Sequence, residues 1–99
     1  MKRLTILISP RATKEIDQAA RWWAAQGFPT FIDDAIAEVL ERLAACPEMA
    51  PRAQIRGKWS TTRRAPVDRG YHLYYRYSPR AETILVRCLW HERRRPPRL

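Results

Sequence analysis

The chain has 99 residues, of which 45% are hydrophobic, and it carries a formal net charge of +9 at neutral pH. This length supports one domain with a modest core and excludes a second domain or a large cofactor-binding fold. The longest nearly apolar stretch, residues 4–8, is too short to cross a membrane, and it breaks at Ser9-Pro10 before an export signal is complete. We therefore expect one cytoplasmic domain over residues 1–99.

The charge is distributed unevenly along the chain. Residues 1–51 contain six Lys and Arg against seven Asp and Glu, whereas residues 52–99 contain thirteen against three. The second half thus carries the whole positive excess, which attracts polyanions or an acidic protein partner.

The first two elements are predicted to be a strand and a helix. Residues 4–8 have the alternation of a short, mostly buried strand. Ser9 and Pro10 favour the start of a helix, because serine caps a helix and proline suits its first turn. Apolar residues recur at helical spacing from Ala12 onward, and Gly27 is placed to end the helix in a left-handed cap.

A second helix is predicted between Thr30 and Pro47. Thr30 and Asp33 have the spacing of a capping box, and aspartate in the first turn favours the helix dipole. Apolar side chains then repeat at helical spacing from Ile32 to Leu43. Because only a few residues join the two helices, we expect an antiparallel helical hairpin.

The second half of the chain changes to a period of two, which is typical of strands. We expect a loop at residues 47–54. Three strands follow, at residues 56–65, 71–77 and 83–91, with turns at 66–70 and 78–81.

Alternation assigns faces to the last two strands. The odd-numbered residues of 71–77 should pack in the core. The even-numbered residues should form the exposed face; they are His72, Tyr74 and Arg76. In the last strand, Trp90 should lie on one face, with Arg87 and His91 on the other.

The predicted order β-α-α-β-β-β defines an α+β domain of two layers. The last three strands form an antiparallel meander, the first strand joins their sheet, and the helical hairpin packs on one face. Residues 93–99 form a basic, proline-rich tail beyond the sheet.

The two cysteines, Cys46 and Cys88, match no zinc-binding or redox motif. Both have apolar neighbours in the sequence, so we interpret them as buried thiols in a reducing compartment. Neither His72 nor His91 has the Cys or His neighbours that a metal site needs. We therefore expect no metal and no cofactor.

The sequence resembles the RelE/ParE superfamily of bacterial toxins over nearly its whole length. The resemblance lies in the element order, the strand YHLYYRY, a hairpin, and the following ILVRCLWHERR. Its most specific part is Tyr75-Arg76 followed by Trp90-His91-Glu92-Arg93-Arg94. Within the superfamily the sequence is more similar to the ParE branch.

This resemblance implies a small cytoplasmic toxin that a cognate antitoxin, ParD-like or similar, holds inactive in an oligomeric complex. It also implies one of two actions. RelE-like members cut mRNA on the ribosome, whereas ParE-like members poison DNA gyrase and have no known catalytic centre of that kind. The fold alone cannot choose between these actions.

Cutting RNA through its own 2′-hydroxyl requires a general base, a general acid and positive charge at the phosphate. His91 is the best proton carrier in the basic half, since histidine titrates near neutral pH. Arg64, Arg76 and Arg87 could hold phosphate oxygens, and Tyr74 or Tyr75 could stack on a base or donate its hydroxyl.

The other parts of such a centre are missing from the sequence. Asp68 and Glu82 lie in or beside predicted turns, so neither is well placed as a base. We therefore favour a toxin that inhibits gyrase by binding, without catalytic residues. The first alternative is a ribosome-dependent mRNA endonuclease that uses His91, Arg76, Arg64 and Tyr74. The second is a basic nucleic-acid-binding module without toxicity.

The surface that binds the target or antitoxin should combine basic and aromatic side chains. Trp22 and Trp23 point about 100° apart on their helix, so only one can face the core squarely. Trp22 either widens the apolar stripe or is an exposed anchor. The predicted binding residues are Arg63, Arg64, Tyr74, Arg76, Arg87, His91, Arg93, Arg94, Arg95 and Trp22.

Overall fold

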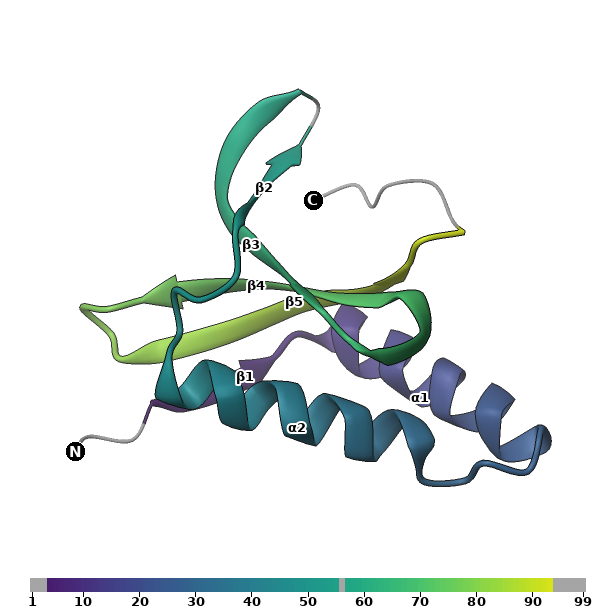
Figure 1. The fold of residues 1–99 in the computed structure, drawn as a ribbon. Helices are drawn as coiled ribbons and strands as arrows, with labels where there is room; N and C mark the ends of the chain where they lie inside the picture. Colours follow the sequence, from purple (N-terminus) through teal and green to yellow (C-terminus); the bar gives the residue numbers. More distant parts are fainter. Residues whose placement is uncertain (1–3, 56, 94–99) are drawn as a thin grey trace.

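The computed structural model of the chain describes residues 4–55 and 57–93. Two helices lie side by side on one face of a sheet, and the hairpin of two strands at one edge of this sheet bends away from the helices (Figure 1). The elements are β1 (Thr5–Ile8), α1 (Pro10–Ala25), α2 (Phe31–Ala45), β2 (Arg52–Ile55), β3 (Lys58–Pro66), the 3₁₀ turn η1 (Asp68–Gly70), β4 (Tyr71–Ser78) and β5 (Thr83–His91).

The sheet has the strand order β1-β5-β4-β3-β2. The α+β class and the antiparallel meander of the last three strands are confirmed. β1, however, pairs in parallel with β5, so the five-stranded sheet is mixed. The loop predicted at residues 47–54 was wrong at its end, because residues from Arg52 pair with β3 and Ala53 is buried against the sheet.

β1 is less buried than its apolar sequence predicts. Leu7 and Ile8 are 52% and 42% exposed. β1 lies at the edge of the sheet, where it pairs only with β5, so the expectation of a mostly buried strand was wrong.

The start of α1 agrees with the sequence. The Ser9 hydroxyl accepts a 3.0 Å hydrogen bond from the Ala12 N–H, and Gly27, with φ of 95°, follows the helix end in the left-handed region. The capping box predicted at Thr30 was wrong. Thr30 has φ −110° and ψ −1° instead of extended backbone, and its side chain makes no capping bond. Neither α1 nor α2, the helices of the described part, is long and apolar enough to span a membrane.

The main core lies between the sheet and the helices. The odd-numbered residues of β4 face it, as predicted, and Leu73 and Tyr75 are completely buried. The Tyr75 hydroxyl donates a 2.7 Å hydrogen bond to the Pro47 carbonyl, which fixes the chain after α2. The helix residues of this core include Ile32, Ile36, Val39 and Leu43.

A β-bulge in β5 reverses the alternation of this strand. Tyr75 of β4 pairs with Val86 and Tyr74 pairs with Cys88, which leaves Arg87 as the extra residue. Ser9 holds the bulge from the other side, since its hydroxyl donates a 2.9 Å hydrogen bond to the Arg87 carbonyl. Beyond the bulge, Leu89 belongs to the main core, while Cys88 belongs to a second cluster on the opposite face.

Candidate functional site

The sheet face turned away from α1 and α2, which we call the outer face, carries three of the predicted arginines. Arg64 of β3 pairs with Tyr74 of β4, and both alternate away from the core. Arg76 lies two residues further along the same face of β4. Arg87 also lies here because of the bulge: its guanidinium donates a 3.0 Å hydrogen bond to the buried hydroxyl of Thr62.

Tyr74 is only 5% exposed, so the prediction that it lies on an exposed face was wrong. It forms a small cluster with Ala53 of β2 and Cys88, against which Trp90 packs. Ala53, which covers Tyr74, comes from β2, a strand that the sequence did not predict. Tyr74 therefore packs beneath the surface of the outer face and does not project into solvent.

The Arg63 side chain is bound to backbone carbonyls and does not project freely into solvent. Its guanidinium donates hydrogen bonds to the carbonyls of Ala50, at 2.7 Å, and Glu48, at 3.3 Å. These bonds hold the segment that leads into β2. Arg64 and Arg76, in contrast, are exposed.

His72 lies on the outer face against the ring of Trp90, with 5.3 Å between ring centroids. Its Nδ1 atom is buried and finds no hydrogen-bond partner in the described part of the chain. Burial lowers the pKa of His72 below 6.5, and the nearby Arg64 lowers it further. The neutral form of the His72 ring therefore persists to a lower pH than the neutral form of an ordinary histidine.

His91 lies on the other side of the sheet, in a groove of about 580 Å³ between α1 and the end of β5. Trp22, which is 56% exposed, lies at this groove and is not part of the core. Trp23 does pack against the core. The two adjacent tryptophans therefore point in different directions, as expected for neighbours about 100° apart on a helix. Arg93 also lines the groove, whereas Arg94 and Arg95 fall outside the described residues.

Both ring nitrogens of His91 are engaged with backbone. Nδ1 accepts a 3.2 Å hydrogen bond from the Arg93 N–H, so Nε2 carries the proton and donates to the Arg69 carbonyl at 3.1 Å. The Tyr71 ring meets the imidazole edge to face, with 4.8 Å between centroids. These contacts hold the imidazole in one orientation, with Nε2 toward the Arg69 carbonyl.

Sequence reasoning missed Arg69 and Tyr71 as parts of this groove. The Arg69 guanidinium lies over the rings of Trp23 and Phe31, at 5.4 and 5.5 Å from their centroids. The Trp23 indole N–H donates a 3.0 Å hydrogen bond to the Tyr71 hydroxyl. The only sequence signal for Arg69 was its place in a turn, which gives no long-range partner.

The structure thus divides the predicted nuclease residues between two surfaces. Arg64, Tyr74 and Arg76 lie on the outer face, while His91 lies in the groove on the helix side.

No three His, Cys, Asp or Glu side chains come together as metal ligands within residues 4–55 and 57–93. Cys88 is buried as predicted, and burial raises its pKa to about 11. Cys46 is exposed at the end of α2, so its predicted burial was wrong.

Solved structures share this fold at low sequence identity. A chain of the toxin–antitoxin complex RelBE2 from Mycobacterium tuberculosis is 17% identical, with a TM-score of 0.69, over 93% of this chain and 94% of that one. A chain of the chromosomal ParDE toxin–antitoxin system from P. aeruginosa is 12% identical, with a TM-score of 0.62, over 90% and 96%. The conserved hypothetical protein HP0894 from Helicobacter pylori is 16% identical, with a TM-score of 0.50, over 91% and 96%.

No curated protein matches the sequence. A protein-family comparison does match, over residues 6–96, to the family described as the ParE toxin of the type II toxin–antitoxin system parDE. The match includes both helices, strands β2 to β5, and all of β1 except Thr5. The chain therefore belongs to the ParE family of type II toxin–antitoxin toxins.

Proposed function

We propose that this protein is a cytoplasmic toxin that stops bacterial growth by binding DNA gyrase, and that it performs no chemistry of its own. The observation that carries the proposal is the environment of His91. This histidine is the best proton carrier in the basic half, yet both its nitrogens are bound to backbone groups.

An RNA-cleaving centre needs its base, acid and cations around one phosphate. Here the exposed Arg64 and Arg76 lie on the outer face, and His91 lies on the helix side of the same sheet. Neither Arg64 nor Arg76 lines the groove that holds His91. This separation favours action by binding over cleavage of mRNA.

We also propose that a cognate antitoxin, ParD-like or similar, neutralises the protein in an oligomeric complex. The family is that of a two-component system, and two chains with the same fold come from a toxin–antitoxin complex and a ParDE system. The exposed Trp22 beside the groove is the kind of aromatic side chain that anchors protein partners.

Gyrase assays with the purified protein test the target. The protein should block supercoiling of relaxed plasmid or trap gyrase on cleaved DNA, and its antitoxin should reverse the effect. His91→Gln keeps a hydrogen-bond donor for the Arg69 carbonyl and should inhibit as well as the natural protein.

A ribosome assay provides the opposing result. If the protein cuts ribosome-bound mRNA at defined codons and His91→Gln abolishes the cutting, the protein is a nuclease and the proposal of gyrase binding is wrong. Tight binding to nucleic acid with neither gyrase inhibition nor mRNA cleavage would instead indicate a plain binding module.

A further inference from the structure

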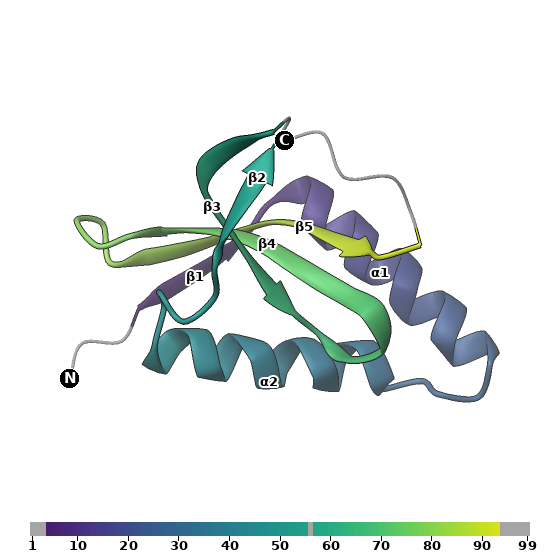
Figure 2. The same cartoon turned by 45° about the horizontal axis from the view of Figure 1, so that its top comes forward.

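The β2–β3 hairpin extends beyond the rest of the sheet. β4 pairs with β3 only from Arg63 to Pro66, whereas Lys58 and Trp59 pair with β2 alone. The hairpin bends away from the helices, so α1 and α2 cover neither face of its outer part (Figures 1 and 2). A partner can therefore reach the face of the hairpin that continues the helix side of the sheet.

Strand pairing shows which side chains share that face. Ala53 belongs to the cluster on the outer face, so its neighbours Arg52 and Gln54 lie on the opposite face of β2. Trp59 pairs with Gln54, and Arg63 pairs with Arg52, so all four side chains lie on the same side of the hairpin. We call this side, with Arg52, Gln54, Trp59 and Arg63, the hairpin inner face.

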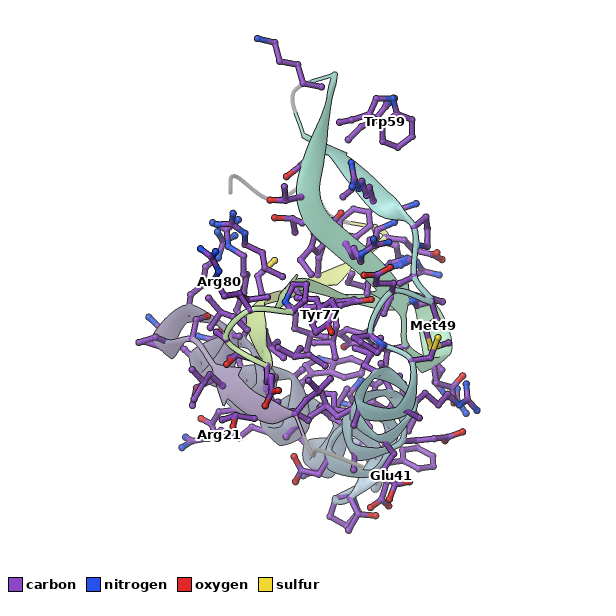
Figure 3. The ribbon with its side chains drawn as sticks, turned by 90° about the vertical axis from the view of Figure 1, so that its left-hand side faces the viewer. Arg21, Glu41, Met49, Trp59, Tyr77 and Arg80 are labelled. Atoms are coloured by element: carbon purple, nitrogen blue, oxygen red, sulfur yellow. The ribbon has the colours of Figure 1, made fainter. Side chains whose placement is uncertain are left out.

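The most exposed side chain of this face is Trp59. It is 70% exposed, more than any other large hydrophobic residue in the described part of the chain. Figure 3 shows it beside the hairpin, above Met49 and far from Arg21 and Glu41 on the helices. Trp59 lies outside both hydrophobic clusters of the described residues, so packing in the core does not account for a tryptophan there.

Two arginines lie beside this tryptophan on the hairpin inner face. The pair Arg52 and Arg63 is two residues of β2 away from the pair Gln54 and Trp59, which is about 7 Å along the strand. Backbone carbonyls hold the Arg63 guanidinium, whereas Arg52 is exposed. Like charges directly opposite each other destabilise a sheet, so an anion bound at Arg52 would relieve their repulsion.

The charge of the whole hairpin also favours an anionic partner. Residues 52–66 contain five Lys and Arg and no Asp or Glu. Glu48 is the acidic residue that precedes the hairpin in the chain, and it contributes its backbone carbonyl to Arg63. One carboxylate beside five cations leaves this element strongly positive, which attracts a polyanion.

The combination of an exposed indole and a neighbouring arginine selects among polyanions. A single-stranded nucleic acid offers unpaired bases that stack on an aromatic ring, with phosphates beside each base. A duplex keeps its bases stacked on one another, and an acidic polypeptide has no regular alternation of charge and flat ring. Neither of these would use both Trp59 and Arg52.

We propose that the hairpin inner face binds single-stranded nucleic acid, with Trp59 stacked on a base and Arg52 at a neighbouring phosphate. Arg63 adds positive charge from the opposite strand. Arg64 and Arg76 lie on the outer face of the sheet and take no part in this contact. Binding at the hairpin requires no gyrase, so it goes beyond the proposed function.

Fluorescence anisotropy with labelled oligonucleotides tests this contact in the whole protein. The probes are an oligothymidylate and an oligouridylate, each of about 12 nucleotides. Binding of either supports the proposal, and the tighter of the two identifies the strand as DNA or RNA. Trp59→Ala should weaken this binding about tenfold, and Trp59→Phe, which keeps an aromatic ring, should restore most of the loss. A duplex of the same length should lose less than about twofold in Trp59→Ala, because its bases are already stacked.

Arg52→Ala tests the phosphate contact and leaves the Arg63 bonds to the chain before β2 intact. It should weaken binding of the single strand about fivefold and lower the slope of log affinity against log salt by about 0.7.

Two matched variants control for these changes. Trp22→Ala removes an exposed tryptophan of α1, and Arg76→Ala removes an exposed arginine of the outer face. Both should leave the affinity for the single strand within about twofold. Circular dichroism should show equal thermal unfolding for Trp59→Ala and the natural protein, since Trp59 lies outside the core.

Several results would overturn the inference. These are no measurable binding of either oligonucleotide, losses in the control variants equal to those in Trp59→Ala and Arg52→Ala, or an equal loss for the duplex in Trp59→Ala. Tighter binding of an oligoglutamate of equal charge would also overturn it, because the hairpin would then suit an acidic polypeptide. Gyrase inhibition by a protein that binds no oligonucleotide would reject this inference alone; oligonucleotide binding without gyrase inhibition would reject only the proposed target.

Discussion

The indole N–H of Trp23 donates a 3.0 Å hydrogen bond to the hydroxyl of Tyr71, which joins α1 to the first residue of β4. Tyr71→Phe leaves this half-buried donor without its acceptor. We expect the free energy of unfolding to fall by about 1 kcal/mol, measured by urea denaturation. Tyr77→Phe, at another half-buried tyrosine of β4, is the control; an equal loss there would show that the Trp23 bond contributes nothing specific.

Glu15 of α1 supports the part of β5 that extends past β1. Its carboxylate accepts a 3.2 Å hydrogen bond from the Leu89 N–H, a group at the open edge of the strand. Glu15→Ala should lower the free energy of unfolding by about 1 to 2 kcal/mol, because the N–H stays part-buried without a partner. Glu15→Gln keeps an acceptor oxygen and should restore most of the loss; equal losses in both variants would indicate that charge matters instead.

The two thiols should differ sharply in reactivity. Burial raises the pKa of Cys88 to about 11, whereas Cys46 is exposed. Because the thiolate is the reactive form, an aromatic disulfide reagent at about pH 8 should modify one thiol per folded chain and two in urea. Cys46→Ser should abolish the reaction of the folded protein. Rapid modification of that variant would show that Cys88 is accessible.

The lowered pKa of His72 makes stability depend on pH. Its cause is burial first and Arg64 second, with Glu92 acting in the opposite direction. Below its ordinary pKa of 6.5 the unfolded chain binds a proton that the folded chain resists, so the free energy of unfolding should fall as the pH drops through 6.5. His72→Gln should reduce this fall, measured by urea denaturation at about pH 7.5 and about pH 5.5. An unchanged pH dependence in the variant would contradict the assignment.

Local patterns in the sequence predicted most of the fold. Ser9 and Gly27 marked the ends of α1 correctly because capping depends on neighbouring backbone. The alternation in β4 identified Leu73 and Tyr75 as core residues because one face of that strand is covered by helices. The order of these elements and the motifs on the last two strands carried the resemblance to the family, which the family comparison confirmed.

The features that sequence reasoning missed depend on distant contacts. β2 has only four residues, and it is a strand because it pairs with β3. When β2 pairs with β3, Ala53 packs against Tyr74 and helps to bury it. No pattern within β4 alone could indicate this burial. The position of His91 depends on a single extra residue, Arg87, whose bulge cannot be recognised from alternation in β5 alone.

The bulge at Arg87 also has a consequence for how this protein can change over evolution. Because the two halves of β5 alternate in opposite phase, one strand supplies Val86 and Leu89 to the core and Arg87 to the outer face. Loss of the extra residue Arg87 would restore regular pairing and leave Leu89 opposite Leu73, whereas loss of a residue elsewhere in β5 would reverse the faces of the residues on one side of the deletion. We therefore expect relatives to tolerate a one-residue deletion at the bulge far better than a one-residue deletion elsewhere in β5.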